Sequence, residues 1–439
     1  MNRVFGRREF VGAAASVAAA CLMPEVGHCT AELKDSYTSA SIMIGKKYAV
    51  PSFSPEEYRR RWRVLQELMG KREIECLLIT EPRSIHYVAN LPGYREEDDN
   101  FCVVPAQGTP SLFLAWGELY CYAQDISAIP EIVSLSTLFS KEKAASGSSD
   151  NSLGPLVEKI RNLGLEKSTI GVDSLTSRMK VSTFTALQKE FPSARFVDAS
   201  ELLVSCCMVR SDEEIGFFRR SREIGERAFL AMVHAAKPGV TEKQLLGACV
   251  GSLISDGADM QTRIMHTIAH WPDPRSASNY AYPYHQGGTE RKLQKGDIVL
   301  MELYSSYSGY YSDVCLPIAV GKPPQDFIER FEICKEMIDA ARSVLRPGKT
   351  QDEVDAAVMS CLTSKLKRQV DIRSVADLKP FAIEPGHGIK GELKPGMVIN
   401  VPPKTTWDQG PNHICGETLI TTAGTPEKIG NLPIEIAIV

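Results

Sequence analysis

Short apolar runs alternate with helix-period segments through the first half of the chain. A helical pattern begins at Pro55 and repeats apolar residues at helical spacing from Trp62 to Met69. Three later runs, flanked by turn residues, have the length and composition of buried strands: 75–79, 101–104 and 170–173. Residues 53–205 are therefore predicted to form an α/β domain.

The second half of the chain mixes longer helices with strands. A helix is expected from Arg210 to Ala236, where Ser211 and Glu214 have the spacing of a capping box. Further helices are predicted at 241–255, 327–345 and 351–366, and strands at 297–304, 310–320 and 397–401. Because helices and strands do not strictly alternate, residues 206–439 are expected to form an α+β domain.

The first thirty residues differ from both domains. Arg7 and Arg8 precede Phe10 and an Ala-rich apolar stretch that is too short to span a bilayer. This order is typical of a twin-arginine export signal and predicts a periplasmic or extracellular protein, with 31–52 as a linker. A frayed amphipathic terminus is the alternative, and Cys21 could also carry a lipid anchor. No later stretch predicts a transmembrane segment.

Composition narrows the class of protein. The chain has 439 residues, of which 43% are hydrophobic and 24% charged, so global disorder and a fibrous architecture are excluded. A formal charge of −4 gives no reason to expect a nucleic-acid partner. The 12 cysteines are spread over a large chain without a C-x-x-C pair, and we interpret most of them as buried thiols.

The strand at 297–304 carries the first candidate for chemistry. Glu302 follows Ile298 and Leu300 on one face, and a carboxylate on an apolar face is costly unless it is paired, bonded or metal-bound. Asp313 lies beyond a predicted turn at 305–309 and could face Glu302 across a hairpin. The alternative is a strand-end acid that makes a local backbone bond.

Histidine, tyrosine and cysteine residues supply further candidates. His285 lies in an aromatic loop, and His387 lies between two glycines that let the backbone approach a ligand. Either histidine could instead be packed into a turn. Tyr284 and Tyr304 could line a pocket for a small cationic or aromatic molecule, or belong to ordinary core and rim. Cys315 could be a thiolate nucleophile, with a packed thiol as the alternative.

These motifs, in this order, resemble the pita-bread superfamily of creatinase, aminopeptidase P and methionine aminopeptidase over residues 53–435. The resemblance implies an N-terminal creatinase-like α/β domain followed by a C-terminal pita-bread domain, α+β overall. It implies that His285 handles protons and that His387 is the family's histidine ligand. Glu302 and Asp313 stand at the positions of the family's two metal-binding aspartates.

The resemblance also implies a homodimer in which Arg95 reaches into the partner's pocket. The chain departs from the family's five-ligand set, because Pro402 and Gly416 stand where dinuclear members have glutamates. Glu417 comes one place later, and a one-residue shift along a strand turns a side chain to the other face. Cys315 and Pro402 also replace two glutamates of creatinase. Four residues could hold a single divalent cation such as Fe, Mn or Zn: Glu302, Asp313, His387 and Glu417.

The leading hypothesis is a divergent creatinase-like hydrolase or lyase that acts on a small molecule by His285 acid–base catalysis. This hypothesis has no paired metals and no expected cofactor, and classical metalloaminopeptidase activity is not expected. One alternative is a single-metal enzyme, similar to Xaa-Pro aminopeptidases or to dimethylsulfoniopropionate lyases. Another is a non-catalytic binding protein that keeps the fold. The predicted catalytic residues are His285, Glu302, Asp313 and His387, and the predicted substrate contacts are Arg95, Tyr284, Tyr304 and Cys315.

Overall fold

The structure is a computed structural model. It describes residues 43–44, 50–92, 99–135, 153–175, 179–259, 263–270, 290–361, 370–371, 379–380, 391–403, 406–407 and 415–439. Within these ranges, no helix has both the length and the apolar character needed to cross a membrane.

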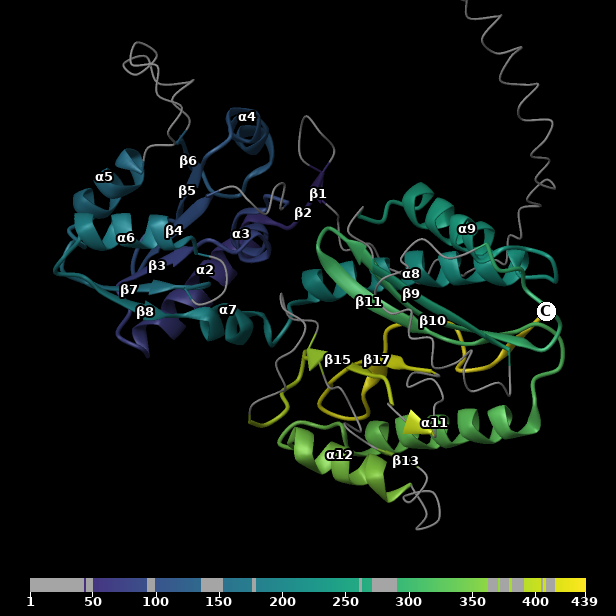
Figure 1. The fold of residues 1–439 in the computed structure, drawn as a ribbon. Helices are drawn as coiled ribbons and strands as arrows, with labels where there is room; N and C mark the ends of the chain where they lie inside the picture. Colours follow the sequence, from purple (N-terminus) through teal and green to yellow (C-terminus); the bar gives the residue numbers. More distant parts are fainter. Residues whose placement is uncertain are drawn as a thin grey trace, which may run out of the picture. The chain divides into compact units, whose positions relative to one another are not determined.

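A six-stranded mixed sheet forms the centre of the N-terminal domain (Figure 1). Its strands are β3 (Cys76–Ile79), β4 (Phe101–Pro105), β5 (Ser111–Leu114), β6 (Glu131–Ser134), β7 (Thr169–Val172) and β8 (Arg195–Asp198). The strand order is β6-β5-β4-β3-β7-β8, with parallel pairing in β3–β7, β7–β8 and β5–β6. A short pair, β1 (Met43–Ile44) with β2 (Pro51–Ser52), precedes this domain.

Both faces of this sheet are covered by helices. Leu77 and Ile79 pack in one core with four helices: α2 (Pro55–Gly70), α3 (Pro82–Ala89), α4 (Gly117–Ile126) and α7 (Ser200–Cys207). Cys76 and Leu78 point the other way and pack with α5 (Gly154–Asn162) and α6 (Val181–Glu190). Burial on both faces explains why this strand is a continuous apolar run in the sequence.

Asp173 follows β7 and caps the start of α3. Its Oδ1 accepts a hydrogen bond from the Thr80 backbone N–H (2.8 Å) and its Oδ2 one from the Glu81 N–H (3.3 Å). Burial outweighs these bonds and raises the pKa of Asp173 from 3.8 to about 6. The Asp173 carboxyl group therefore binds a proton more tightly in the folded protein than in the unfolded chain.

We expect Asp173 to make the protein less stable as the pH rises. The folded pKa of Asp173, about 6, exceeds its unfolded value. The stabilisation that Asp173 contributes is therefore complete below pH 3.8 and is lost as the pH rises through about 6. Linkage gives a loss of roughly 2 kcal/mol between about pH 4.5 and about pH 7.5. Asp173→Asn should remove this part of the pH dependence in urea unfolding. Asp198→Asn, at an exposed site, should leave it, and equal slopes for all three proteins would contradict the assignment.

The C-terminal domain contains two larger sheets. The first joins β9 (Arg263–His270), β10 (Asp297–Tyr307), β11 (Tyr310–Cys315), β12 (Ile318–Ala319) and β19 (Ala437–Ile438). The second is antiparallel and has the order β14 (Lys379–Pro380), β15 (Val398–Val401), β17 (Glu417–Ile420), β18 (Glu427–Lys428). A separate pair joins β13 (Val370–Asp371) to β16 (Thr406–Trp407).

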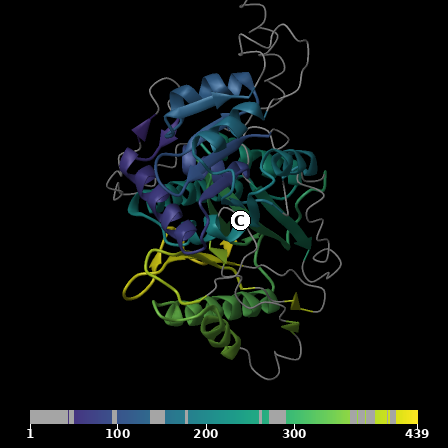
Figure 2. The ribbon, with the colours of Figure 1, turned by 90° about the vertical axis from the view of Figure 1, so that its left-hand side faces the viewer.

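Four described helices cover these sheets in two pairs. α8 (Asp212–Ala235) and α9 (Glu242–Ser255) share a core with β10 and β11. α11 (Gln325–Val344) and α12 (Gln351–Ser360) share another with β15 and β17. Figure 1 and Figure 2 show β15 and β17, in yellow, between α11 and the β10–β11 hairpin. The predicted capping box at the start of α8 is confirmed, since Ser211 and Glu214 exchange both bonds.

The β10–β11 hairpin closes in a two-residue turn, shorter than predicted. Ser308 and Gly309 have positive φ angles of 49° and 80°, as a type I′ turn requires. Ser305 and Ser306 belong to β10 and are buried, because their hydroxyl groups have partners in the fold. Asp259 accepts hydrogen bonds from the Ser306 hydroxyl (2.6 Å) and from the backbone N–H groups of Ser308 (3.0 Å) and Gly309 (2.7 Å).

Helix α8 packs closely against one face of this hairpin. A Cβ atom at Gly225 would lie only 2.7 Å from Ser305 Oγ, so glycine permits the approach. The Ser221 hydroxyl donates to the Ser305 carbonyl (2.8 Å), and the Ser305 hydroxyl donates to the Ser221 carbonyl (2.6 Å). This face is therefore filled by helix, and the opposite face is left for the site.

A buried charged cluster joins the two domains, which both lie within the unit Ile42–Val439. Arg61 of α2 is 1% exposed, and its guanidinium lies 4.1 Å from the centre of the Phe53 ring. It donates to Glu57 Oε1 (2.8 Å), to the Tyr87 carbonyl (2.8 Å) and to the Tyr310 hydroxyl (2.9 Å). Since Tyr310 begins β11, this arginine connects the N-terminal domain to the hairpin.

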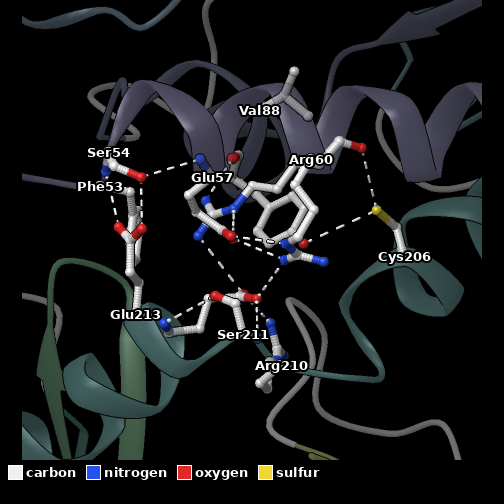
Figure 3. Close-up of polar contacts among 12 residues, drawn as sticks. Phe53, Ser54, Glu57, Arg60, Val88, Cys206, Arg210, Ser211 and Glu213 are labelled. Carbon is white, nitrogen blue, oxygen red and sulfur yellow. Dashed lines mark hydrogen bonds and ion pairs between the residues drawn. The ribbon is translucent and has the colours of Figure 1, made fainter. Parts of the chain in front are cut away.

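Glu214 of α8 is the acidic centre of the same cluster. It is fully buried and accepts hydrogen bonds from Arg60 (2.9 Å), Arg210 (3.0 Å) and the Tyr310 hydroxyl (3.1 Å). Figure 3 shows Glu57 and Arg60 reaching from α2 toward Arg210 and Ser211 at the start of α8. The contact between the domains is thus a network of ion pairs and hydrogen bonds.

Candidate active site

The candidate site lies on the face of the β10–β11 hairpin opposite α8. In the register, Glu302 faces Cys315 and Tyr304 faces Asp313. Directly opposed residues of an antiparallel pair project to the same side, so all four side chains share one face. The intervening Leu303 belongs to the core beneath α8. The hairpin therefore brings two acids, one tyrosine and one cysteine together.

Asp313 is almost completely buried, with 1% of its surface exposed. Its Oδ2 accepts a hydrogen bond from Asn400 Nδ2 (2.7 Å), and its Oδ1 has no hydrogen-bond partner among the described residues. Burial raises the pKa of Asp313 well above 3.8, and the nearby Glu302 raises it further, against smaller opposing effects of Asn400 and Arg222. A buried carboxyl oxygen without a donor is a place where a proton or a cation can bind.

Glu302 lies beside Asp313 and is 8% exposed. The Tyr304 hydroxyl donates a hydrogen bond to Glu302 Oε1. Burial raises the pKa of Tyr304 well above 10, and the charges of Asp313 and Glu302 raise it further, so the phenol stays protonated and can only donate to the carboxylate. Both acids are thus held by neutral donors, Tyr304 for Glu302 and Asn400 for Asp313.

Cys315 fits the packed-thiol interpretation. It is 1% exposed, and burial raises its pKa well above 9, with Asp313 and Glu302 raising it further. A thiol with two acids nearby stays protonated and is a poor nucleophile. Its carbonyl accepts a hydrogen bond from the Gly416 N–H (3.1 Å), which ties the hairpin to the chain just before β17.

Glu417 does not join the carboxyl pair. It faces Val401 across β15–β17, and Val401 belongs to the core that contains α11. Its carboxylate pairs with Arg342 of α11, and its Oε1 lies 3.3 Å from Lys428 Nζ in an ion pair whose angles do not make a hydrogen bond. The alternation of side chains along the strand therefore removes Glu417 from the candidate ligands.

The two positions next to Val401 and Glu417 that lie against the hairpin, Pro402 and Gly416, have no side-chain atom that could bind a metal ion. A Cβ atom at Gly416 would lie 3.4 Å from both Cys315 Cβ and Pro402 Cβ. Within the described part of the chain, no group of three or more His, Cys, Asp or Glu side chains is arranged to hold a metal ion. Among the described residues, Glu302 and Asp313 are the two carboxylates on this face of the hairpin.

Four of the predicted site residues, with the aromatic loop and the Gly-His-Gly motif, fall outside the described residues and remain predictions: Arg95, Tyr284, His285 and His387.

The sequence analysis missed two residues that hold Asp313. Asn400 is a polar residue inside an apolar strand, the same signal that identified Glu302. Arg222 lies four residues after Phe218 on the apolar face of α8, and it donates to the Asp313 carbonyl. Its Nε also donates to Glu226 Oε1 (2.9 Å).

Comparison with known proteins gives matches over most of the chain. The model of the metallopeptidase family M24 matches residues 216–423, and that of the creatinase/prolidase N-terminal domain matches residues 61–209. A probable dipeptidase PepE of Mycobacterium tuberculosis is 23% identical over 404 residues, 88% of this chain and 98% of that protein. A creatinase of a Bacillus species is 22% identical over 429 residues, 92% of this chain and 97% of that protein.

Solved structures agree on the fold. The Xaa-Pro dipeptidase from Bacillus anthracis has a TM-score of 0.70 at 21% identity and covers 87% of this chain and 100% of its own. With the two-domain α+β architecture and the order of the motifs, these matches confirm the family and the fold expected from the sequence. The chain belongs to the creatinase and M24 metallopeptidase superfamily, with a creatinase-like N-terminal domain followed by a pita-bread domain.

Proposed function

We propose that this protein hydrolyses small substrates, with dipeptides as the first candidates. One divalent cation, held by Glu302 and Asp313, is proposed to assist the reaction. The observation that carries the proposal is the buried Asp313 Oδ1, which lacks a hydrogen-bond partner among the described residues and lies beside a second carboxylate. Several relatives carry dipeptidase names, which favours peptide hydrolysis over the creatinase-like or lyase reaction that the sequence first suggested.

The residues around the carboxylate pair support one cation rather than two. Two-metal hydrolases need bridging carboxylates, and the positions that face the hairpin here are Pro402 and Gly416. Glu417 is engaged by Arg342 and Lys428 on the other side of the strand. His387, where the resemblance implies a nitrogen ligand, would complete a mixed oxygen and nitrogen set.

A bound divalent cation would supply a Lewis acid and lower the pKa of water at the site. The chain itself supplies orientation. Tyr304 holds Glu302 and Asn400 holds Asp313, while burial excludes bulk water and strengthens the attraction between a carboxylate and a cation. His285 is proposed to carry the proton between water and the leaving nitrogen.

A second candidate, metal-free acid–base catalysis on a small molecule, is favoured by the raised pKa of Asp313. The raised pKa favours the protonated form of Asp313, and a protonated carboxyl group could donate a proton to a leaving nitrogen or carbon. This reaction would need no cation, so metal dependence separates the two candidates.

Export and assembly are part of the proposal. The paired arginines at residues 7 and 8 support export by the twin-arginine route. The resemblance supports a homodimer in which Arg95 of each subunit reaches the other's site. Size-exclusion chromatography with light scattering would show a monomer if this assembly is wrong.

Metal content and hydrolysis test the function together. Protein purified without chelator and then loaded with Mn²⁺, Fe²⁺ or Zn²⁺ should hold about one equivalent by mass spectrometry of the elements, because two carboxylates and one histidine serve one ion. Cleavage of Xaa-Pro and other dipeptides should fall at least about tenfold with EDTA and return with metal. Two equivalents would contradict the single-cation site. Unchanged turnover of a small molecule without metal would favour the second candidate.

A further inference from the structure

Asn400 lies where the two sheets of the C-terminal domain meet. It is in β15 and faces Thr418 of β17 in the register. Its neighbours Ile399 and Val401 point into the core with α11, so Asn400 points the other way, toward β11. Its side chain is 4% exposed. The residue is thus a buried amide on the site side of an apolar strand.

The amide is fixed at both ends. Asn400 Nδ2 donates to Asp313 Oδ2 (2.7 Å), and Asn400 Oδ1 accepts from the Thr418 hydroxyl (3.4 Å). The Asp313 carboxylate fixes which end of the amide carries the NH₂ group, because an ionised carboxylate only accepts hydrogen bonds, whereas the Thr418 hydroxyl could pair with either end. The chain Thr418, Asn400, Asp313 therefore crosses from one sheet to the other with one consistent donor direction.

We infer that Asn400 is a positioning residue for Asp313, an inference that rests on the proposed function. By occupying Oδ2 it stops rotation of the carboxyl group and leaves Oδ1 as the oxygen directed to the ligand. The amide is also neutral, so it orients Asp313 without cancelling the negative charge that attracts a cation. A lysine or arginine here would orient the acid and neutralise it at the same time.

A comparison of three variants with the wild type tests the inference, with Mn²⁺ alone as the binding probe. Asn400→Leu removes the donor at similar volume, and Asn400→Ser shortens it beyond reach of Asp313. Asn90→Gly is the matched control, since Asn90 is also buried, has a φ of 58° that glycine adopts, and donates to the Ile126 carbonyl (3.2 Å) far from the site in sequence. All four proteins are compared by thermal unfolding, Mn²⁺ titration calorimetry and dipeptidase kinetics.

Both Asn400 variants should weaken Mn²⁺ binding and lower kcat by about 10- to 100-fold, the range found when a group that orients a metal ligand is removed. The KM of the Asn400 variants should stay within about threefold of the wild-type value. The control, Asn90→Gly, should lose thermal stability and keep the Mn²⁺ affinity and kcat of the wild type. A purely structural role would lower the melting temperature of the Asn400 variants without moving kcat or Mn²⁺ affinity.

The outcomes separate this inference from the proposed function. A wild type that binds Mn²⁺ and cleaves dipeptides, beside Asn400 variants with unchanged affinity and kcat, would overturn the inference alone. A wild type that neither binds Mn²⁺ nor cleaves dipeptides would overturn the proposed function, and the inference with it. Asn400 variants that do not fold would assign Asn400 to the fold and overturn its positioning role.

Discussion

Asp313→Asn is expected to lower kcat/KM at least about 1000-fold. The amide has the shape of the carboxyl group but carries neither the charge that binds a cation nor a proton that it can give up, and such losses at catalytic acids commonly reach this size. Thermal stability should stay level or rise. The raised pKa of Asp313 shows that its buried environment disfavours the charged form, which the variant no longer contains.

Glu417→Gln is the contrasting variant. Glu417 is as buried as Asp313 but faces α11, where it pairs with Arg342 and Lys428. The exchange should lower the melting temperature, because it leaves two cations without their acid, and should keep kcat/KM within about threefold. Equal losses of activity in the two variants would show that Glu417 belongs to the site after all, and full activity in Asp313→Asn would remove Asp313 from the mechanism.

Local patterns in the sequence predicted the elements that local physics controls. The strand at Cys76–Ile79 is buried on both faces, so its continuous apolar run was visible in the sequence. The capping box at Ser211 depends on side chains three residues apart and was equally visible. The turn after Tyr304 was predicted too long, because Ser305 and Ser306 resemble loop residues until Ser221 and Asp259 supply partners for their hydroxyl groups.

The site was predictable only in part, for the same reason. Period-two alternation was enough to suggest that Glu302 projects from an apolar face and that Glu417, one residue out of place, turns away. The bond between Asn400 and Asp313 joins residues 87 positions apart in different sheets, and no spacing rule predicts it. The contact of Arg61 with Tyr310 spans 249 positions and depends on how two domains meet. Long-range polar partners are therefore what the sequence did not reveal.

Removing Glu214 is expected to be the most destabilising single change in the junction between the domains. Glu214 is fully buried and accepts hydrogen bonds from Arg60, Arg210 and Tyr310, with Arg61 Nη2 3.7 Å from its Oε1. Glu214→Ala would leave buried guanidinium groups without this acid. Breaking a buried ion-pair network in this way costs about 3–5 kcal/mol of unfolding free energy, a large part of the stability of most domains.

Glu213→Ala provides the control. Glu213 lies beside Glu214 in the first turn of α8, so both acids interact with the helix dipole in the same way. It bonds only partly buried groups of Ser54, the backbone N–H (2.8 Å) and the hydroxyl (2.5 Å), so its loss should cost about 1 kcal/mol. Urea unfolding followed by circular dichroism would measure both variants. Similar losses for the two would show that the helix terminus, rather than the buried cluster, carries the stability.

The pH dependence gives the same prediction a second test. Burial alone would raise the pKa of Glu214, but the charges of Arg61 and Arg210 and the hydrogen bond from Ser211 outweigh it and hold the pKa below 4.5. A carboxyl group with a lowered folded pKa contributes its full stabilisation above the unfolded pKa and loses it as the pH falls through the folded value. The difference in unfolding free energy between the wild type and Glu214→Gln should therefore be constant above about pH 4.5 and become smaller as the pH falls further. A difference that grows with acid would mean that Glu214 is protonated in the folded protein.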